Sequence, residues 1–222
     1  MSEANDRAVD DEAPRQDRSE QPEALPTDLE ERPLAQHPAP FVREHLEAEE
    51  RRLKDSILRM GSMVAEQVIA AIDAMERHDV DAATAVIVAD ERLNEAQREI
   101  TNDVSTTIAT QQPVARDLRF LLTLEHVAYD LERMGDHAGS VAKQARKLAP
   151  HAPLADYVHL PEMGRLVAQQ VRDVLAAVVD VDEVWAREVA KRDDDVDELY
   201  HRIFAETLDL MRADPDNVDR GA

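Results

Sequence analysis

The sequence predicts an all-α protein built from long amphipathic helices. Only five of its 222 residues are Gly and only 3% are aromatic, whereas Ala, Leu, Glu and Arg are abundant. This composition favours helices over sheets. Apolar residues also recur at steps of three, four or seven over stretches of about 30 residues, which places them on one face of a helix. The core must therefore consist mainly of Leu, Val, Ile, Ala and Met.

Three helices are predicted between residues 41 and 149. The first begins near Phe41 and runs to about His78. The second ends at Gln112, because Pro113 cannot continue a helix and restricts the residue before it. Pro113 then suits the first turn of the third helix, which ends near residue 149. Short connections make consecutive helices antiparallel, so we expect a three-helix bundle.

The second half of the chain repeats the first at an offset of 103 residues. The matched positions include a Met-Gly pair, a Gln and an Asp, at residues 60, 61, 67 and 90 in one half and 163, 164, 170 and 193 in the other. Polar matches on one offset across two helices indicate an internal repeat. The last helix of the second copy would end beyond Ala222. We therefore expect three helices followed by two, with the sixth absent.

The first 40 residues differ from the rest of the chain. They are rich in Asp, Glu, Pro, Gln and Ser, and they contain few apolar residues. Such a segment cannot bury enough apolar surface to offset the entropy lost on ordering, so we expect a disordered acidic tail. The predicted organisation is this tail at 1–40, a first repeat at 41–150 and an incomplete second repeat at 155–222.

Charge and composition exclude several functional classes. The formal net charge of −22 argues against nucleic acid as a partner, because binding it requires clustered Lys and Arg. The absence of Cys excludes disulfides, thiolate metal sites and cysteine nucleophiles. No apolar run approaches the ~20 residues that span a bilayer, and the N-terminus has no signal-peptide pattern. We expect a cytoplasmic protein without direct membrane insertion.

Two stretches carry a specific motif pattern. Residues 108–119 read IATQQPVARDLR, and residues 130–138 read DLERMGDHA. Together with the repeated helices, they resemble the PhoU family over about residues 41–220. The resemblance implies tandem three-helix-bundle repeats, here with the second repeat lacking its last helix. It also implies a homodimeric signalling adaptor in phosphate homeostasis, a negative regulator that contacts a Pst-type phosphate-transporter ATPase and its sensor histidine kinase.

Two oxygen pairs on neighbouring helices suggest a metal site. Glu132 and Asp136 are four residues apart, so both carboxylates leave one helix in the same direction. Asp90 and Asn94 form the same arrangement on the preceding helix, and facing pairs of this kind assemble carboxylate metal sites. The resemblance adds that paired E/D-x-x-x-D motifs hold divalent or iron cations, often as multinuclear clusters, in some family members. The alternative from the residues alone is a solvated acidic helix face.

The second half contains a related motif and several residues with simpler interpretations. Asp193 and Asp197 form a D-x-x-x-D pair, but their partners would lie on the absent sixth helix, so another subunit would have to complete that site. His137 is turned about 100° from Asp136 and is expected to be exposed. Gly135, mid-helix, indicates close helix packing. Trp185 is expected in the core, or lining an exposed groove if the sixth helix is absent.

Three functional readings remain open from the sequence. The leading one is a non-enzymatic regulatory binding module, because no Gly-rich phosphate loop or nucleophile motif is present. A carboxylate-bridged di-metal enzyme is the alternative, but it would require inward-facing Glu-x-x-His motifs, and no convincing one occurs. A truncated paralogue without signalling activity is the third reading.

Overall fold

The computed structural model describes residues 40–152 and 159–221, and within them it is entirely helical. The predicted all-α fold is confirmed. The acidic tail predicted at residues 1–40 lies, except for Pro40, outside the described residues.

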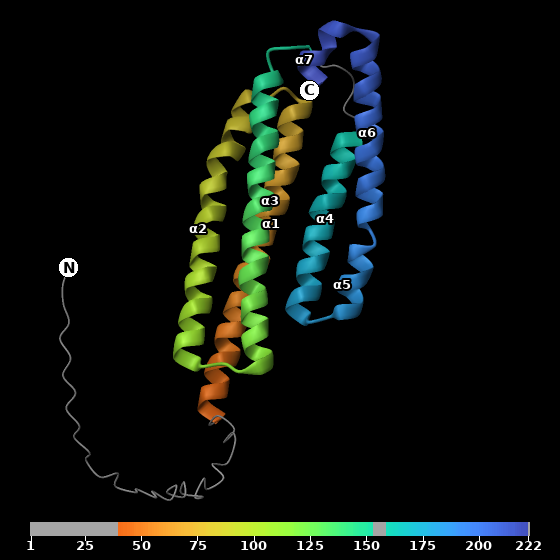
Figure 1. Ribbon diagram of the computed structural model, residues 1–222. Helices are drawn as coiled ribbons and strands as arrows, with labels where there is room; N and C mark the ends of the chain where they lie inside the picture. Colours follow the sequence, from red (N-terminus) through yellow and green to blue (C-terminus); the bar gives the residue numbers. More distant parts are fainter. Residues whose placement is uncertain (1–39, 153–158, 222) are drawn as a thin grey trace, which may run out of the picture. The chain divides into compact units, whose positions relative to one another are not determined.

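Three long helices form an antiparallel bundle in the first half. These are α1 (Pro40–Glu76), α2 (Val80–Gln111) and α3 (Ala115–Leu148), and each packs against the other two (Figure 1). Their ends lie close to the predicted ones. One detail differs, because Pro113 precedes α3 and does not belong to its first turn. It follows Gln112, which ends α2 in the left-handed conformation with φ of 49°.

The second half contains α4 (His159–Asp180), α5 (Glu183–Ala190) and α6 (Asp193–Ala213). A short 3-10 helix, η1 (Pro215–Asn217), and α7 (Val218–Gly221) follow. Helix α4 lies along α1, whereas α5 and α6 pack on α4 (Figure 1). The single helix that the sequence predicts after α4 is therefore divided in two at residues 191–192.

A side chain from α4 contacts the chain at this break. Gln170 Nε2 donates a hydrogen bond of 2.6 Å to the backbone carbonyl of Arg192, the residue that precedes α6. The Arg192 guanidinium is held by Asp173 at 2.7 Å and lies 4.8 Å from the centre of the Trp185 ring. Trp185 is 36% exposed, so the expectation that it belongs to the core is wrong. Its ring instead supports the arginine at the break.

The turn after α1 recurs after α4, 103 residues later. His78 and Val181 both adopt the left-handed conformation, with φ of 54° and 55°. The next residue is an Asp in each case, and its side chain accepts a hydrogen bond of 2.9 Å from the backbone N–H three residues on. These two aspartates, Asp79 and Asp182, are the N-caps of α2 and α5. The offset found in the sequence thus relates two identical local structures.

The contact between α1 and α4 is reciprocal. A Cβ atom added to Gly61 would collide with the Leu175 side chain, and one added to Gly164 would collide with Ile72. The offset of 103 residues relates Gly61 to Gly164 and Ile72 to Leu175. The two contacts are therefore equivalent, with the roles of α1 and α4 exchanged. Each helix therefore offers a glycine to receive an aliphatic side chain of the other. Such a contact is expected when two copies of one unit pack through an approximate two-fold axis.

One apolar core extends across α1 to α4. Its fully buried members are Leu53, Ile57, Met60, Val64, Leu93, Ile100, Val104, Leu121, Leu124, Ala128, Leu131, Val171 and Leu175. By contrast, Leu199 is the only buried residue of α6 in the described structure, and Tyr200 and Phe204 are each 53% exposed. The second half thus buries its apolar stripe less completely than the first.

Gly61→Val should lower the free energy of unfolding by about 1–3 kcal/mol, because the added methyl groups overpack the contact with Leu175. Gly139→Ala is the matched control: apart from the neighbouring backbone of α3 itself, no described atom lies within 4 Å of a Cβ added there. That change should raise stability by up to about 1 kcal/mol through helix propensity. Urea unfolding followed by circular dichroism measures both, and a Gly61→Val protein as stable as wild type would contradict the packing argument.

Candidate functional site

Three of the carboxylates predicted as metal ligands influence one another across α2 and α3. Burial raises the pKa of Asp90, and the negative charge of Asp136 raises it further, while Lys143 acts in the opposite direction. Burial also raises the pKa of Glu132, followed by the charges of Asp136 and Asp90, against Arg133. The fold therefore brings Asp90, Glu132 and Asp136 into one region of negative potential.

Gly135 explains how α2 and α3 approach each other at this level. The Leu93 side chain fills the place that a Cβ of Gly135 would take, so close packing accounts for the glycine as expected. The same Cβ position lies 3.6 Å from Asp90 Oδ1. Because Gly135 directly precedes Asp136, the α2 carboxylate lies beside the α3 backbone that carries the other two.

The remaining predicted ligands are placed less favourably. Asn94 is half-buried one turn after Asp90, whereas Asp193 and Asp197 are exposed at the start of α6. His137 is exposed, as expected. Within residues 40–152 and 159–221, no group of three or more His, Cys, Asp or Glu side chains has an arrangement that could hold a metal ion. The three neighbouring carboxylates thus share a region without forming a finished ligand set.

Sequence reasoning missed Gln67 as a residue of this region. It is only 7% exposed, and its Oε1 atom is buried without a hydrogen-bond partner. That oxygen lies 3.3 Å from the Cβ position of Gly135. The sequence marks Gln67 only through its match with Gln170. The sequence signal that could have identified Gln67 is its position among the apolar residues on the buried face of an amphipathic helix.

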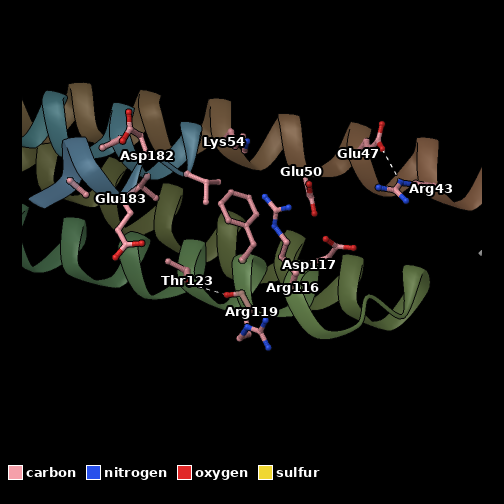
Figure 2. Close-up of a pocket in the computed structure, with 15 residues that line it drawn as sticks. Arg43, Glu47, Glu50, Lys54, Arg116, Asp117, Arg119, Thr123, Asp182 and Glu183 are labelled. Carbon is pink, nitrogen blue, oxygen red and sulfur yellow. Dashed lines mark hydrogen bonds and ion pairs between the residues drawn. The ribbon is translucent and has the colours of Figure 1, made fainter. Parts of the chain in front are cut away.

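A cavity of about 540 Å³ lies between α1, α3 and the turn from α4 to α5 (Figure 2). Its apolar wall includes Phe120, Val178 and Val181, and Lys54 Nζ lies 5.1 Å from the centre of the Phe120 ring. The motif at residues 108–119 supplies Arg116, Asp117 and Arg119 to the lining. The motif at residues 108–119 therefore lies at a different place from the carboxylates of the motif at residues 130–138.

Charges of both signs surround this cavity. Burial raises the pKa of Glu50, and the charge of Asp117 adds to the effect. Figure 2 shows Arg116 directed toward Glu50 and Arg119 directed away from it. Neither arginine forms an ion pair with any residue in the described part of the chain. The charge of Arg116 acts on Glu50 and lowers its pKa, so Arg119 is the arginine better placed to meet an anionic group from outside.

In the described parts of the chain, none of the helices has the length and apolar character needed to cross a bilayer.

The raised pKa values of Asp90 and Glu132 give a pH dependence with a defined sign. A folded-state pKa above the unfolded one means that the charged group disfavours folding, so stability is lost as pH rises from the ordinary values, 3.8 and 4.5, through the raised ones. In metal-free protein at pH 7, Asp90→Asn and Glu132→Gln should therefore each raise the free energy of unfolding. The expected gain is roughly 0.2–0.5 kcal/mol, as for other like-charge pairs.

Urea titrations in a chelator at pH 7 and near pH 4 measure this gain, which should shrink at the lower pH. Asp130→Asn is the control, because Asp130 is exposed in the same motif and lies 3.9 Å from Arg133. A gain of equal size at both pH values, or one equalled by Asp130→Asn, would contradict the electrostatic origin.

Comparison with known proteins identifies the family. The PhoU domain family matches residues 57–145 and 160–221. A phosphate-specific transport system accessory protein PhoU homologue from Clostridium acetobutylicum is 39% identical over 181 residues, covering 81% of this chain and 83% of that protein. The homologue from Aquifex aeolicus is 34% identical over 167 residues, covering 75% of this chain and 76% of its own.

Solved structures agree with the sequence relatives. PhoU from Pseudomonas aeruginosa superposes with a TM-score of 0.74 at 31% identity, covering 79% of this chain and 84% of that one. The phosphate transport system regulatory protein PhoU from Streptococcus pneumoniae gives a TM-score of 0.69 at 28% identity, covering 76% and 79%. The relatives are accessory and regulatory proteins, not enzymes. The chain belongs to the PhoU family of phosphate-transport regulatory proteins.

Proposed function

We propose that the protein is a metal-binding adaptor that represses phosphate uptake and phosphate-starvation signalling. In this role it contacts the ATPase of a Pst-type phosphate transporter and the associated sensor histidine kinase. The ATPase and the kinase domain both consume ATP, so the cytoplasm is the compartment in which the adaptor would act. Membership of the PhoU family supports the role, and the carboxylates between α2 and α3 support the dependence on a metal.

The metal proposal rests on the position of Asp90 Oδ1, 3.6 Å from the Cβ position of Gly135 and so beside the part of α3 that carries Glu132 and Asp136, where the negative charges of these groups repel one another. A bound cation would turn this repulsion into attraction and would link α2 to α3. The donors are all oxygens, which suit Mg²⁺, Ca²⁺, Mn²⁺ or iron better than zinc. Asn94 would add a neutral and therefore weaker ligand. A second ion at Asp193 and Asp197 would require ligands from another subunit.

We further propose that the cavity at Phe120 is the place where a partner protein docks. Its apolar wall can receive an aliphatic or aromatic side chain, and Arg119 can bind a carboxylate at the rim. The motif residues of α3 would then serve partner binding, while Glu132 and Asp136, about four to six turns further along α3, serve metal binding.

Two tandem repeats are the proposed organisation of the chain, at residues 41–150 and 155–222. The paired turns at His78 and Val181 and the reciprocal contact of Gly61 and Gly164 support it. The family also matches two separate segments.

Self-association through α6 is part of the proposal. The stacked rings of Tyr200 and Phe204, 6.2 Å apart, form an exposed apolar surface on this helix. Covering such a surface would remove apolar area from water. We expect light scattering at micromolar concentration to give the mass of a dimer, and Phe204→Glu to give the mass of a monomer.

Val88→Glu is the control for self-association, because Val88 is 70% exposed on α2, away from α6. It should leave the dimer intact. A wild-type protein that remains monomeric would refute the dimer, and a Phe204→Glu protein that remains dimeric would refute the α6 interface.

The regulatory role is tested by gene deletion and complementation. In a strain without paralogues, deletion should raise expression of phosphate-starvation genes in phosphate-rich medium, and the wild-type gene should restore repression. The variant Asp90→Asn/Glu132→Gln/Asp136→Asn should restore it poorly and should hold less metal by elemental analysis, because its ligands are neutral.

Asp130→Asn serves as the matched control and should complement like wild type. Unchanged expression after deletion would count against the regulatory role. Equal metal content in the triple variant and wild type would refute the assignment of these carboxylates as metal ligands, whatever the expression data show.

A further inference from the structure

The offset of 103 residues shows which surface of the second half lacks a covering helix. In the first half, α3 packs on both α1 and α2 (Figure 1). The counterparts of α1 and α2 are α4 and the pair α5 and α6, so a counterpart of α3 would lie on α4 and α6. Among residues 40–152 and 159–221, no helix packs extensively on both, and η1 and α7 contact the end of α6.

Burial differs accordingly between equivalent positions of the two halves. Ala71 of α1 belongs to an apolar cluster with small side chains of α3 and is 1% exposed, whereas its counterpart Val174 on α4 is 36% exposed. Ile100 of α2 is 2% exposed, whereas its counterpart Ile203 on α6 is only half-buried. Apolar positions that α3 covers in the first half are therefore left partly exposed in the second half of the described chain.

Two aromatic rings lie on the same side of α6. Asp90 of α2 lies beside α3, with Oδ1 3.6 Å from the Cβ position of Gly135. The counterpart of Asp90 is Asp193, and Tyr200 and Phe204 follow it two and three turns later on the same side of α6. Both rings are 53% exposed. We call the resulting surface the α4–α6 face and define it by Val174, Val196, Tyr200, Ile203 and Phe204.

Charge indicates what kind of helix fits this face. In the first half, α3 carries six basic and five acidic side chains, whereas α2, on which it packs, carries six acidic and two basic ones. In the second half, α6 is still more acidic, with seven acidic and two basic side chains. Because like charges at close range repel, a helix that covers α6 should have a surplus of basic side chains.

We infer that the α4–α6 face binds an amphipathic helix of a partner protein, one with an apolar stripe of Leu and small residues and a surplus of Lys and Arg. Such a helix would cover Val174 and Phe204, and its basic side chains would meet the exposed Asp193 and Asp197. The inference rests on α6 as the association surface of the proposed function. The proposed dimer uses the same rings, so the partner helix and a second copy would compete for them.

The probe is a fluorescently labelled synthetic peptide with the sequence of residues 115–148, which is α3 itself. Fluorescence anisotropy measures its binding to the full chain, and we expect saturable binding with one peptide per chain. Phe204→Glu and Val174→Glu should each weaken binding about 10-fold or more, because a charge would be buried without a partner. Val88→Glu, on the exposed side of α2, should leave the affinity unchanged.

A second peptide isolates the contribution of charge. The sequence of residues 80–111, which is α2, has nearly the same length and also carries an apolar stripe, but it has a surplus of acidic side chains. It should bind about 10-fold more weakly than the α3 peptide at low salt. The variant Asp193→Asn/Asp197→Asn and high salt should both reduce this difference. Equal affinity of the two peptides for wild-type protein would overturn the requirement for a basic helix.

The outcomes separate this inference from self-association. Light scattering of the chain alone tests the dimer, and a saturating amount of the α3 peptide should lower the mass to that of one chain with one peptide. A monomeric chain that binds the peptide through Phe204 would refute the dimer and support the partner helix. A dimer that keeps its mass at saturating peptide would overturn the partner helix and support the second copy as the occupant of the face.

Absence of binding would also overturn the inference, because the face would then be closed by the chain itself or by the second copy. So would binding that is equally tight in Phe204→Glu and Val174→Glu, since the peptide would then lie elsewhere. Circular dichroism checks that the variants keep their helix content, and Tyr200→Glu replaces Phe204→Glu if that variant does not.

Discussion

The fold depends on α1 being buried on several sides at once. This helix packs against α2 and α3 in the first half and against α4 in the second, and its Leu53, Ile57 and Met60 are essentially inaccessible to water. Val171 and Leu175 of α4 belong to the same apolar core. Because the two halves share one core, neither can lose its packing without exposing part of the other. The marginal stability of proteins makes such shared burial a strong constraint on any substitution in α1.

The position of α1 also decides which polar groups can meet. The charged side chains of α1 lie mainly on its exposed face, whereas Gln67 is a polar residue on its buried face. The close approach of α3 at Gly135 brings the amide near Asp90 of α2. Burial is the largest cause of the raised pKa values of Asp90 and Glu132, and repulsion by the neighbouring carboxylates adds to it, so both effects follow from the packing of the helices. Favourable apolar packing holds together charges that would separate in an open structure.

Helix positions could be predicted from the sequence because the apolar stripes and Pro113 are local signals. The pairing of Glu132 with Asp136 is also local, and it placed both residues correctly on one side of α3. The break before Asp193 could not be predicted, because no Pro or Gly marks it and the side chain that contacts it, Gln170, lies on another helix. The sequence left Trp185 between a core and an exposed position, because the Arg192 guanidinium that lies 4.8 Å from the centre of its ring cannot be placed there by local signals. Gln67 escaped notice because the buried position of its amide becomes apparent only when its neighbours in space are known.

The reciprocal contact of Gly61 with Leu175 and Gly164 with Ile72 bears on the ancestry of the protein. A symmetric dimer of a single three-helix unit would contain the same pair of contacts, and each substitution of its glycine would alter both of them together. Duplication and fusion of the gene would release this coupling, since each glycine is then encoded separately. One half could drift while the other kept its packing. The unequal fates of Gln67 and Gln170 are the kind of divergence that such a fused ancestor permits.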